Sequence, residues 1–125
     1  MNSQPKFSPG KNIAMKIPPH QYDETLRFYR DVLGLKEITS HAPSIGFEYG
    51  TNNLWIDSVP GISQAEIWLE IVTNDVSVAA GKMKAEGIVR CDEIEQLPEG
   101  FQGFWISSPA SIIHLICQDT DSWSK

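Results

Sequence analysis

The chain has 125 residues, a formal net charge of −6 and a sequence pI of about 4.9. That length suits one compact domain, because roughly two thirds of the unfolded surface can be buried at this size. A negative charge repels phosphate backbones and anionic membranes, so we expect no nucleic-acid partner and no membrane partner. No stretch approaches the roughly 18 apolar residues of a membrane span.

The ends of the chain differ in composition from its middle. Residues 1–10 are polar, contain prolines and lack the apolar stretch of a signal peptide, which predicts a flexible arm and a cytoplasmic location. Residues 119–125 form a polar tail. Cys91 and Cys117 lie in apolar, strand-like segments, so we expect buried free thiols in a reducing compartment.

A first structural unit begins at residues 12–17, where polar and apolar side chains alternate as in a half-buried strand. The prolines at 18–19 end that strand, and Asp23 is the expected N-cap of a helix. Gly34 can adopt the left-handed conformation that ends helices. Three short strands are then expected at 35–39, 44–49 and 53–57.

The same plan restarts at residues 66–72, which alternate again. Asp75 is the expected cap of a second helix and Gly87 its end, 53 positions after Gly34. Three strands are expected after it, at 88–92, 101–106 and 112–117. The sequence therefore predicts an internal repeat of βαβββ modules, at 11–58 and 64–118.

The stretch Phe28-Tyr29-Arg30-Asp31-Val32-Leu33-Gly34-Leu35 resembles the helix-ending signature of the vicinal oxygen chelate superfamily. That superfamily includes glyoxalase I, extradiol dioxygenases and the bleomycin and fosfomycin resistance proteins. With the repeat, the resemblance covers about residues 11–118 as a single domain. It implies an α+β fold in which two βαβββ repeats form a curved mixed sheet, with a concave pocket and helices on the convex side. An unrelated ferredoxin-like α+β domain is the alternative, and it has fewer strands after each helix.

Alternation along the strands predicts which side chains face away from the helices. On the first, fourth and fifth strands they are Asn12, Ala14, Lys16, Asn53, Trp55, Asp57, Glu66, Trp68 and Glu70. The last strand is apolar on both faces, so its periodicity does not choose between them. The resemblance of residues 108–115 to the family's final strand implies that His114 points into the pocket.

The expected ligand pocket combines tryptophans with polar groups, because indoles suit surfaces that are dry at one end and wet at the other. Its residues are Asn12, Trp55, Asp57, Trp68, Glu70, Trp105 and His114. The tryptophans could equally bury themselves against a second subunit. The loop at 92–103 is expected at the pocket rim, as a lid or a simple connection.

The family's metal site uses a His, Gln or similar ligand on the first strand, a Glu on the fourth, a His on the fifth and a Glu on the eighth. This chain departs from that pattern at most positions, so we expect no metal and no other cofactor. If a divalent ion is bound, the ligands available are Asp57, Glu70 and His114. His114 is the best candidate catalytic residue, with an ordinary structural role as the alternative. His20 and His41 lie in loops and are expected to be solvated.

The function that the resemblance implies is a glyoxalase-like or bleomycin-resistance-like protein that binds a small organic molecule in an aromatic, acidic cleft. The alternative is a metal-dependent lyase, isomerase or dioxygenase of the same superfamily. A third reading is a dimerisation or regulatory module, and a homodimer is expected in any case. The sequence leaves open whether any reaction is catalysed.

Overall fold

The computed structural model describes residues 4–122, which contain nine strands and two α-helices. Parallel and antiparallel strand pairs both occur, so the architecture is a mixed α+β one. The chain divides into two compact units: the N-terminal unit comprises residues 11–68, and the C-terminal unit comprises residues 4–10 and 69–122. The boundary falls inside strand β6 (Glu66–Thr73), between Trp68 and Leu69.

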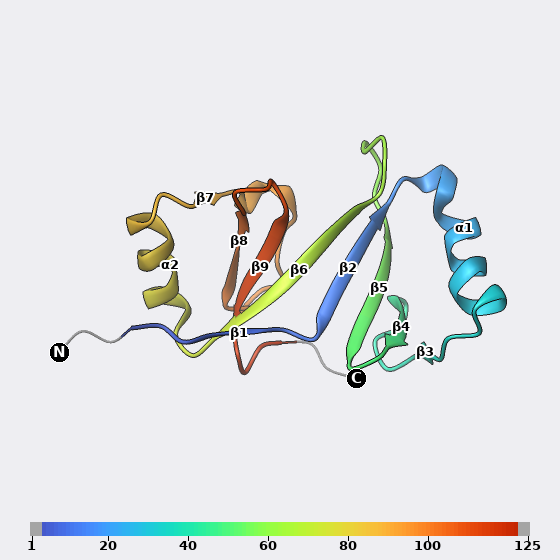
Figure 1. The fold of residues 1–125 in the computed structure, drawn as a ribbon, viewed down its shortest axis with the longest axis horizontal. Helices are drawn as coiled ribbons and strands as arrows, with labels where there is room; N and C mark the ends of the chain where they lie inside the picture. The colour runs from blue at the N-terminus through green and yellow to red at the C-terminus, as the bar shows by residue number, and fades with distance from the viewer. Residues whose placement is uncertain (1–3, 123–125) are drawn as a thin grey trace. The chain divides into compact units, whose positions relative to one another are not determined.

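The N-terminal unit holds one helix and the strands that it covers (Figure 1). Its elements are β2 (Asn12–Ile17), α1 (Pro19–Arg27), a π-helical turn η1 (Phe28–Val32), β3 (Glu37–Ile38), β4 (Ile45–Tyr49), β5 (Asn52–Ser58) and the start of β6. The strand order is β3-β4-β5-β2-β6, with β2 and β5 parallel. Apolar side chains from α1 and the strands form the core, namely Ile17, Leu26, Phe47, Leu54 and Ile56.

The C-terminal unit repeats this plan with a helix of its own. Its elements are β1 (Phe7–Pro9), the end of β6, α2 (Val76–Ala85), β7 (Val89–Arg90), a 3-10 turn η2 (Asp92–Ile94), β8 (Gly103–Ser107) and β9 (Ile113–Gln118). The strand order is β6-β9-β8-β7, with β6 and β9 parallel. Ala79 of α2 packs against Phe104, Ile106 and Ile116 of the strands.

The predicted pair of βαβββ modules is confirmed, because each unit runs strand, helix and three strands in that order. Gly34 and Gly87 follow the two helices with φ of 68° and 74°, the left-handed conformation expected of them. Asp75 caps α2 as predicted, since its carboxylate accepts from the backbone N–H groups of Ser77 and Val78 at 3.1 Å each.

The predicted start of the first helix was wrong. Asp23 was expected at the N-cap, but α1 begins at Pro19 and the N-cap is Pro18, which makes no side-chain capping bond. Proline is well suited to the first helical position, because its fixed φ matches the helix and its missing N–H would have no partner there. The proline pair therefore starts the helix as well as ending the strand.

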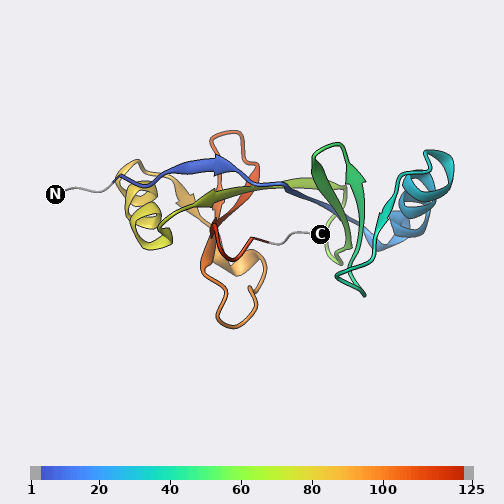
Figure 2. The ribbon, with the colours of Figure 1, turned by 90° about the horizontal axis from the view of Figure 1, so that it is seen from below.

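Part of the expected flexible arm is structured. Phe7 to Pro9 form β1, which runs beside β6 (Figure 2). The two strands are antiparallel, and Phe7 pairs with Thr73. The Gly10 N–H also donates to the backbone oxygen of Glu70 at 2.8 Å. A strand of three residues is too short to show a periodic sequence pattern, so β1 is recognised only by its pairing with β6. The last three residues of the expected polar tail, 123–125, lie outside the described residues. No helix within residues 4–122 has the length and apolar character needed to cross a membrane.

Candidate functional site

The strands of the N-terminal unit carry tryptophan and polar side chains on the side opposite α1, and several of these side chains are buried. Leu54 and Ile56 of β5 belong to the core beneath α1, so the alternate side chains of that strand point the other way, as predicted. We call this surface the tryptophan face. Its side chains are Asn12, Ala14, Lys16, Asn53, Trp55, Asp57, Glu66 and Trp68.

Strand register arranges the tryptophan face in rows. Trp55 and Trp68 are both strand partners of Ala14, so a methyl group lies between two indoles. In the next row, Asp57 and Glu66 are both partners of Lys16. In this register Trp55 lies level with Ala14, and Asp57 lies level with Lys16.

A buried cation lies at the centre of the charged row. The Lys16 ammonium is 2.7 Å from Asp57 Oδ2 and 4.4 Å from the centre of the Trp68 ring. Lys16 is only 4% exposed, whereas the Asp57 side chain is 36% exposed. The ion pair therefore joins a buried ammonium to a carboxylate that is partly exposed to water. Alternation placed Lys16 on this face, but nothing in the sequence indicated that its charge would be buried.

Hydrogen bonds fix the orientation of both indoles. Asn12 Oδ1 accepts from Trp55 Nε1 at 2.8 Å and from Asn53 Nδ2 at 3.1 Å. Trp68 Nε1 donates to Glu66 Oε1 at 2.9 Å. Both tryptophans are 5% exposed. Their polar N–H groups are thus satisfied within the tryptophan face, and their rings are held in one arrangement.

His41 was expected to be solvated, and besides its exposed part it contacts the tryptophan face. Its ring lies edge-on to Trp55, with centroids 5.4 Å apart, and its side chain is only partly exposed. On another side of the indole, a Cβ added to Gly46 would lie 2.5 Å from Trp55 Cε3. The glycine therefore lets the indole lie flat on β4. Neither contact is local in sequence, which is why the loop composition around His41 gave no signal for it.

In the C-terminal unit, Glu70 and Trp105 face away from α2, in one row with Leu115 between them. Trp105 Nε1 donates to the backbone oxygen of Glu95 at 2.9 Å, so the loop at 92–103 packs on this indole. Glu70 is buried, and Ser122 Oγ donates to its Oε1 at 3.1 Å.

His114 lies on the opposite face from the one expected. It is the strand partner of Leu69 and Ile106, and Ile106 packs in the core with α2. Its Nδ1 is 3.0 Å from the backbone oxygen of Ile112. The last strand is apolar on both sides, so only packing of Ile116 against α2 fixes its orientation. Consequently Glu70 and His114, two of the three conditional metal ligands, project from opposite faces.

Within residues 4–122, no three His, Cys, Asp or Glu side chains come together closely enough to hold a metal ion. Both cysteines are free thiols, as expected, and Cys117 is buried while Cys91 is partly exposed. Burial, reinforced by the neighbouring Glu70 carboxylate, raises the pKa of Cys117 to about 12. That thiol therefore stays protonated, and it donates a hydrogen bond to Glu70 Oε2 with Sγ 3.8 Å away.

No protein-family model matches the sequence, and no curated protein matches it either. Solved structures do resemble the fold. A Mn(II)-bound glyoxalase from Novosphingobium aromaticivorans has a TM-score of 0.66 at 17% identity, over 97% of this chain and 42% of that one. A methylmalonyl-CoA epimerase from Mycobacterium tuberculosis has a TM-score of 0.63 at 10% identity, over 94% and 92%.

A third similar structure is a glyoxalase/bleomycin resistance protein/dioxygenase superfamily member from Vibrio splendidus 12B01. Its TM-score is 0.57 at 14% identity, over 86% of this chain and 97% of that one. At such identities the likeness concerns the fold alone. This chain spans less than half of the glyoxalase but nearly all of the epimerase. The fold is that of the vicinal oxygen chelate proteins, as the sequence resemblance implied.

Proposed function

We propose that this protein binds a small organic molecule on the tryptophan face, and that it does so without the metal chemistry known for this superfamily. The observation that carries the proposal is the row Trp55–Ala14–Trp68, in which two indoles with fixed orientation flank a methyl group. A planar ligand would make edge contacts with the part of the indoles that reaches the surface, since each ring is 5% exposed and edge contacts between aromatic rings are favourable.

The side chains of the tryptophan face do not fit a divalent ion. Asn12 Oδ1 already accepts two hydrogen bonds, and indole rings offer no ligand atom for a metal. The Lys16 ammonium would also repel a metal cation. It already forms an ion pair with Asp57, which is the carboxylate that a metal ion would need as a ligand. These residues fit an organic ligand held by aromatic contacts and hydrogen bonds better.

Charge on the tryptophan face narrows the ligand class. Asp57 and Glu66 flank a single ammonium, and both carboxylates reach solvent. The rim of the face is therefore acidic, with one buried positive charge behind it. Ligands that are neutral or cationic and that donate hydrogen bonds would complement it, whereas anionic ligands would be disfavoured.

Tryptophan fluorescence tests this proposal. We expect saturable quenching by planar heteroaromatic amines and weaker or no quenching by aromatic carboxylates of the same size. Ala14→Leu would fill the space between the two indoles, so we expect it to weaken binding by tenfold or more, on the order of 1.4 kcal/mol. Ile13→Leu is the matched control, because Ile13 is adjacent in β2 but packs toward α1.

Two results would contradict the proposal. One is the absence of quenching by every member of the panel, and the other is unchanged binding in Ala14→Leu with a preserved fold by circular dichroism. Elemental analysis of protein purified without chelator tests the alternative of a metal-dependent lyase, isomerase or dioxygenase. A stoichiometric divalent metal would favour that alternative over the binding protein proposed here.

A further inference from the structure

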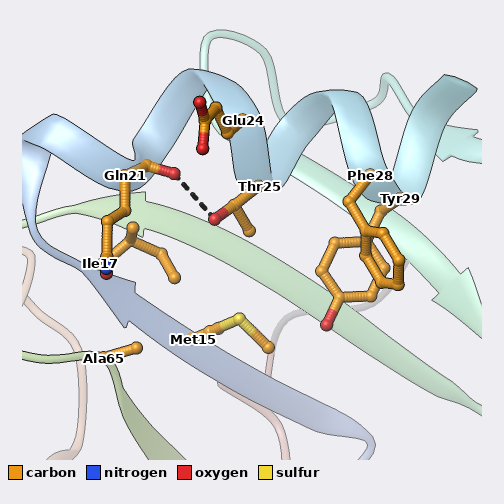
Figure 3. Close-up of a pocket in the computed structure, with 8 residues that line it drawn as sticks. All are labelled: Met15, Ile17, Gln21, Glu24, Thr25, Phe28, Tyr29 and Ala65. Carbon is orange, nitrogen blue, oxygen red and sulfur yellow. Dashed lines mark hydrogen bonds between the residues drawn. The ribbon is translucent and has the colours of Figure 1, made fainter. Parts of the chain in front are cut away.

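A cavity of about 380 Å³ lies between α1 and β2, on the side of the strands opposite the tryptophan face (Figure 3). We call it the α1 pocket. Its floor is apolar, formed by Met15 and Ile17 of β2 and by Ala65 just before β6. None of the residues expected to form the ligand pocket lines it, so it is a separate feature of the N-terminal unit.

The α1 pocket exists because the helix presents short or polar side chains to this part of the strand. Leu26 is the side chain of α1 that is buried in the core, whereas Gln21 and Thr25 line the pocket. Thr25 Oγ1 donates to the backbone oxygen of Gln21 at 2.7 Å (Figure 3). The hydroxyl is thus satisfied within the helix and needs no partner in the cavity.

Two aromatic rings close the far end of the α1 pocket. Phe28 and Tyr29 meet edge to face with centroids 5.0 Å apart, and Tyr29 is anchored against the buried Phe47 at 6.0 Å. Burial raises the pKa of Tyr29, and the nearby Tyr49 raises it further by a smaller amount. Phe28 is nevertheless 44% exposed, so one large ring keeps uncovered surface at the pocket. That surface can accept an apolar group or a cation over the ring.

The α1 pocket is lined by negative charge. Glu24 is the charged residue of its lining, and no lysine, arginine or histidine lines the cavity. Among residues 4–122, no ion pair engages the Glu24 carboxylate. The chain as a whole carries a net charge of −6, which adds a long-range attraction for cations.

We propose that the α1 pocket binds an organic ammonium ion with an apolar, aromatic or aliphatic body. The ammonium pairs with the Glu24 carboxylate at the rim and lies against the exposed ring of Phe28. The body rests on Met15, Ile17 and Ala65. The occupant is a small molecule, because an isolated carboxylate beside an aromatic wall and an apolar floor matches such a cation in both charge and polarity.

Methionine-methyl NMR tests this proposal directly. The chain has three methionines, of which Met15 lines the α1 pocket and Met83 lies in α2. Protein labelled at the methionine methyl groups is titrated with 4-phenylbutylammonium, 4-phenylbutanol and 4-phenylbutyrate, which differ only in the end group. We expect a saturable shift of the Met15 signal, tightest for the ammonium and weakest for the carboxylate, while the Met83 signal stays in place.

Substitutions in the α1 pocket distinguish the contribution of its charge to binding from the contribution of its shape. Glu24→Gln should weaken ammonium binding about threefold to tenfold and leave the alcohol unchanged, because it removes charge at constant size. Ala65→Leu should weaken all three probes by filling the floor. Asp23→Asn is the matched control, since it removes the adjacent carboxylate of α1, which does not line the pocket.

Each of four results would overturn the proposal: an unmoved Met15 signal at 10 mM ammonium probe, equal affinity for the three end groups, equal effects of Glu24→Gln and Asp23→Asn, or a Met15 shift that follows protein concentration without any probe. The last result would assign the α1 pocket to a second copy of the chain. The indole N–H signals report separately on the tryptophan face, so the two proposals fail independently.

Discussion

Lys16 is a charged residue whose side chain is buried. A lysine ammonium is rarely fully buried unless a partner compensates it, and here the partner is a carboxylate that is itself one third exposed. The desolvation cost therefore falls mainly on the lysine. This asymmetry makes the two halves of the ion pair unequal in their effect on stability.

Removing Asp57 and removing Lys16 should change the free energy of unfolding by different amounts. Asp57→Asn removes the carboxylate that lies 2.7 Å from the buried ammonium, so we expect a loss of about 1–3 kcal/mol in the free energy of unfolding, below the full buried-pair value because Asp57 reaches water. Lys16→Met removes the buried charge and returns Asp57 to solvent, so it should cost less than about 1 kcal/mol. Urea denaturation of both variants tests the order, and a larger loss for Lys16→Met would contradict it.

The two thiols should react at very different rates. With the pKa of Cys117 at about 12, against an ordinary value of 9.0, its thiolate fraction at pH 8 falls roughly a thousandfold. Cys91 is partly exposed, so it should react first with a disulfide reagent in the native protein. We expect Cys91→Ser to abolish the fast phase in native buffer and to react fully once unfolded. Rapid native labelling of Cys91→Ser would show that Cys117 is accessible.

Elements were predictable where local chemistry sets their limits. The strand at 12–17 matches β2 at both ends, because two prolines follow it and its alternation is complete. Asp75 and Gly87 bracket α2 as expected, since capping and left-handed termination are local. The orientation of β9 was not predictable, because packing against α2 decides between two equally apolar faces. The error with His114 followed from that.

Gly34, which follows the first helix, and Gly81, which lies inside α2, give a matched pair of substitutions. Gly34 has φ of 68°, where a side chain is strained even though an added Cβ would meet nothing within 4 Å. Gly34→Ala should therefore destabilise the protein by about 1 kcal/mol.

Gly81 lies inside α2, has ordinary helical space around it and also has nothing within 4 Å of an added Cβ. Gly81→Ala should stabilise by about 0.5–1 kcal/mol, because alanine is the better helix former and restricts the unfolded chain. Thermal unfolding of both variants checks the opposite signs. A loss of stability in both would mean that backbone conformation is not the deciding factor.

Across the whole molecule, the two units share the same order of strands and helix, but the side chains opposite their helices differ. Both units place a row of side chains opposite their helix, but one row is Trp55–Ala14–Trp68 and the other is Glu70–Leu115–Trp105. The sequence predicted the backbone because strand, cap, helix and glycine stop recur in register. Alternation predicted the faces of five pocket residues on three strands, namely Asn12, Trp55, Asp57, Trp68 and Glu70. The contact of His41 with Trp55 was not predictable, because it depends on tertiary structure.

The donor chemistry of these rows predicts how the whole protein responds to metal. A native-state site with micromolar affinity would add about 4.1 kcal/mol at 1 mM metal, which for a chain of this size corresponds to a rise in Tm of roughly 15 °C. Because indoles, an amide with two bonds and a buried ammonium occupy the tryptophan face, we expect MnCl2 or ZnCl2 at 1 mM, and EDTA, to change Tm by less than about 1 °C. Differential scanning fluorimetry measures this, with magnesium as the control for ionic strength. A metal-specific rise that EDTA reverses would require ligands outside this face and would return metal-dependent chemistry to consideration.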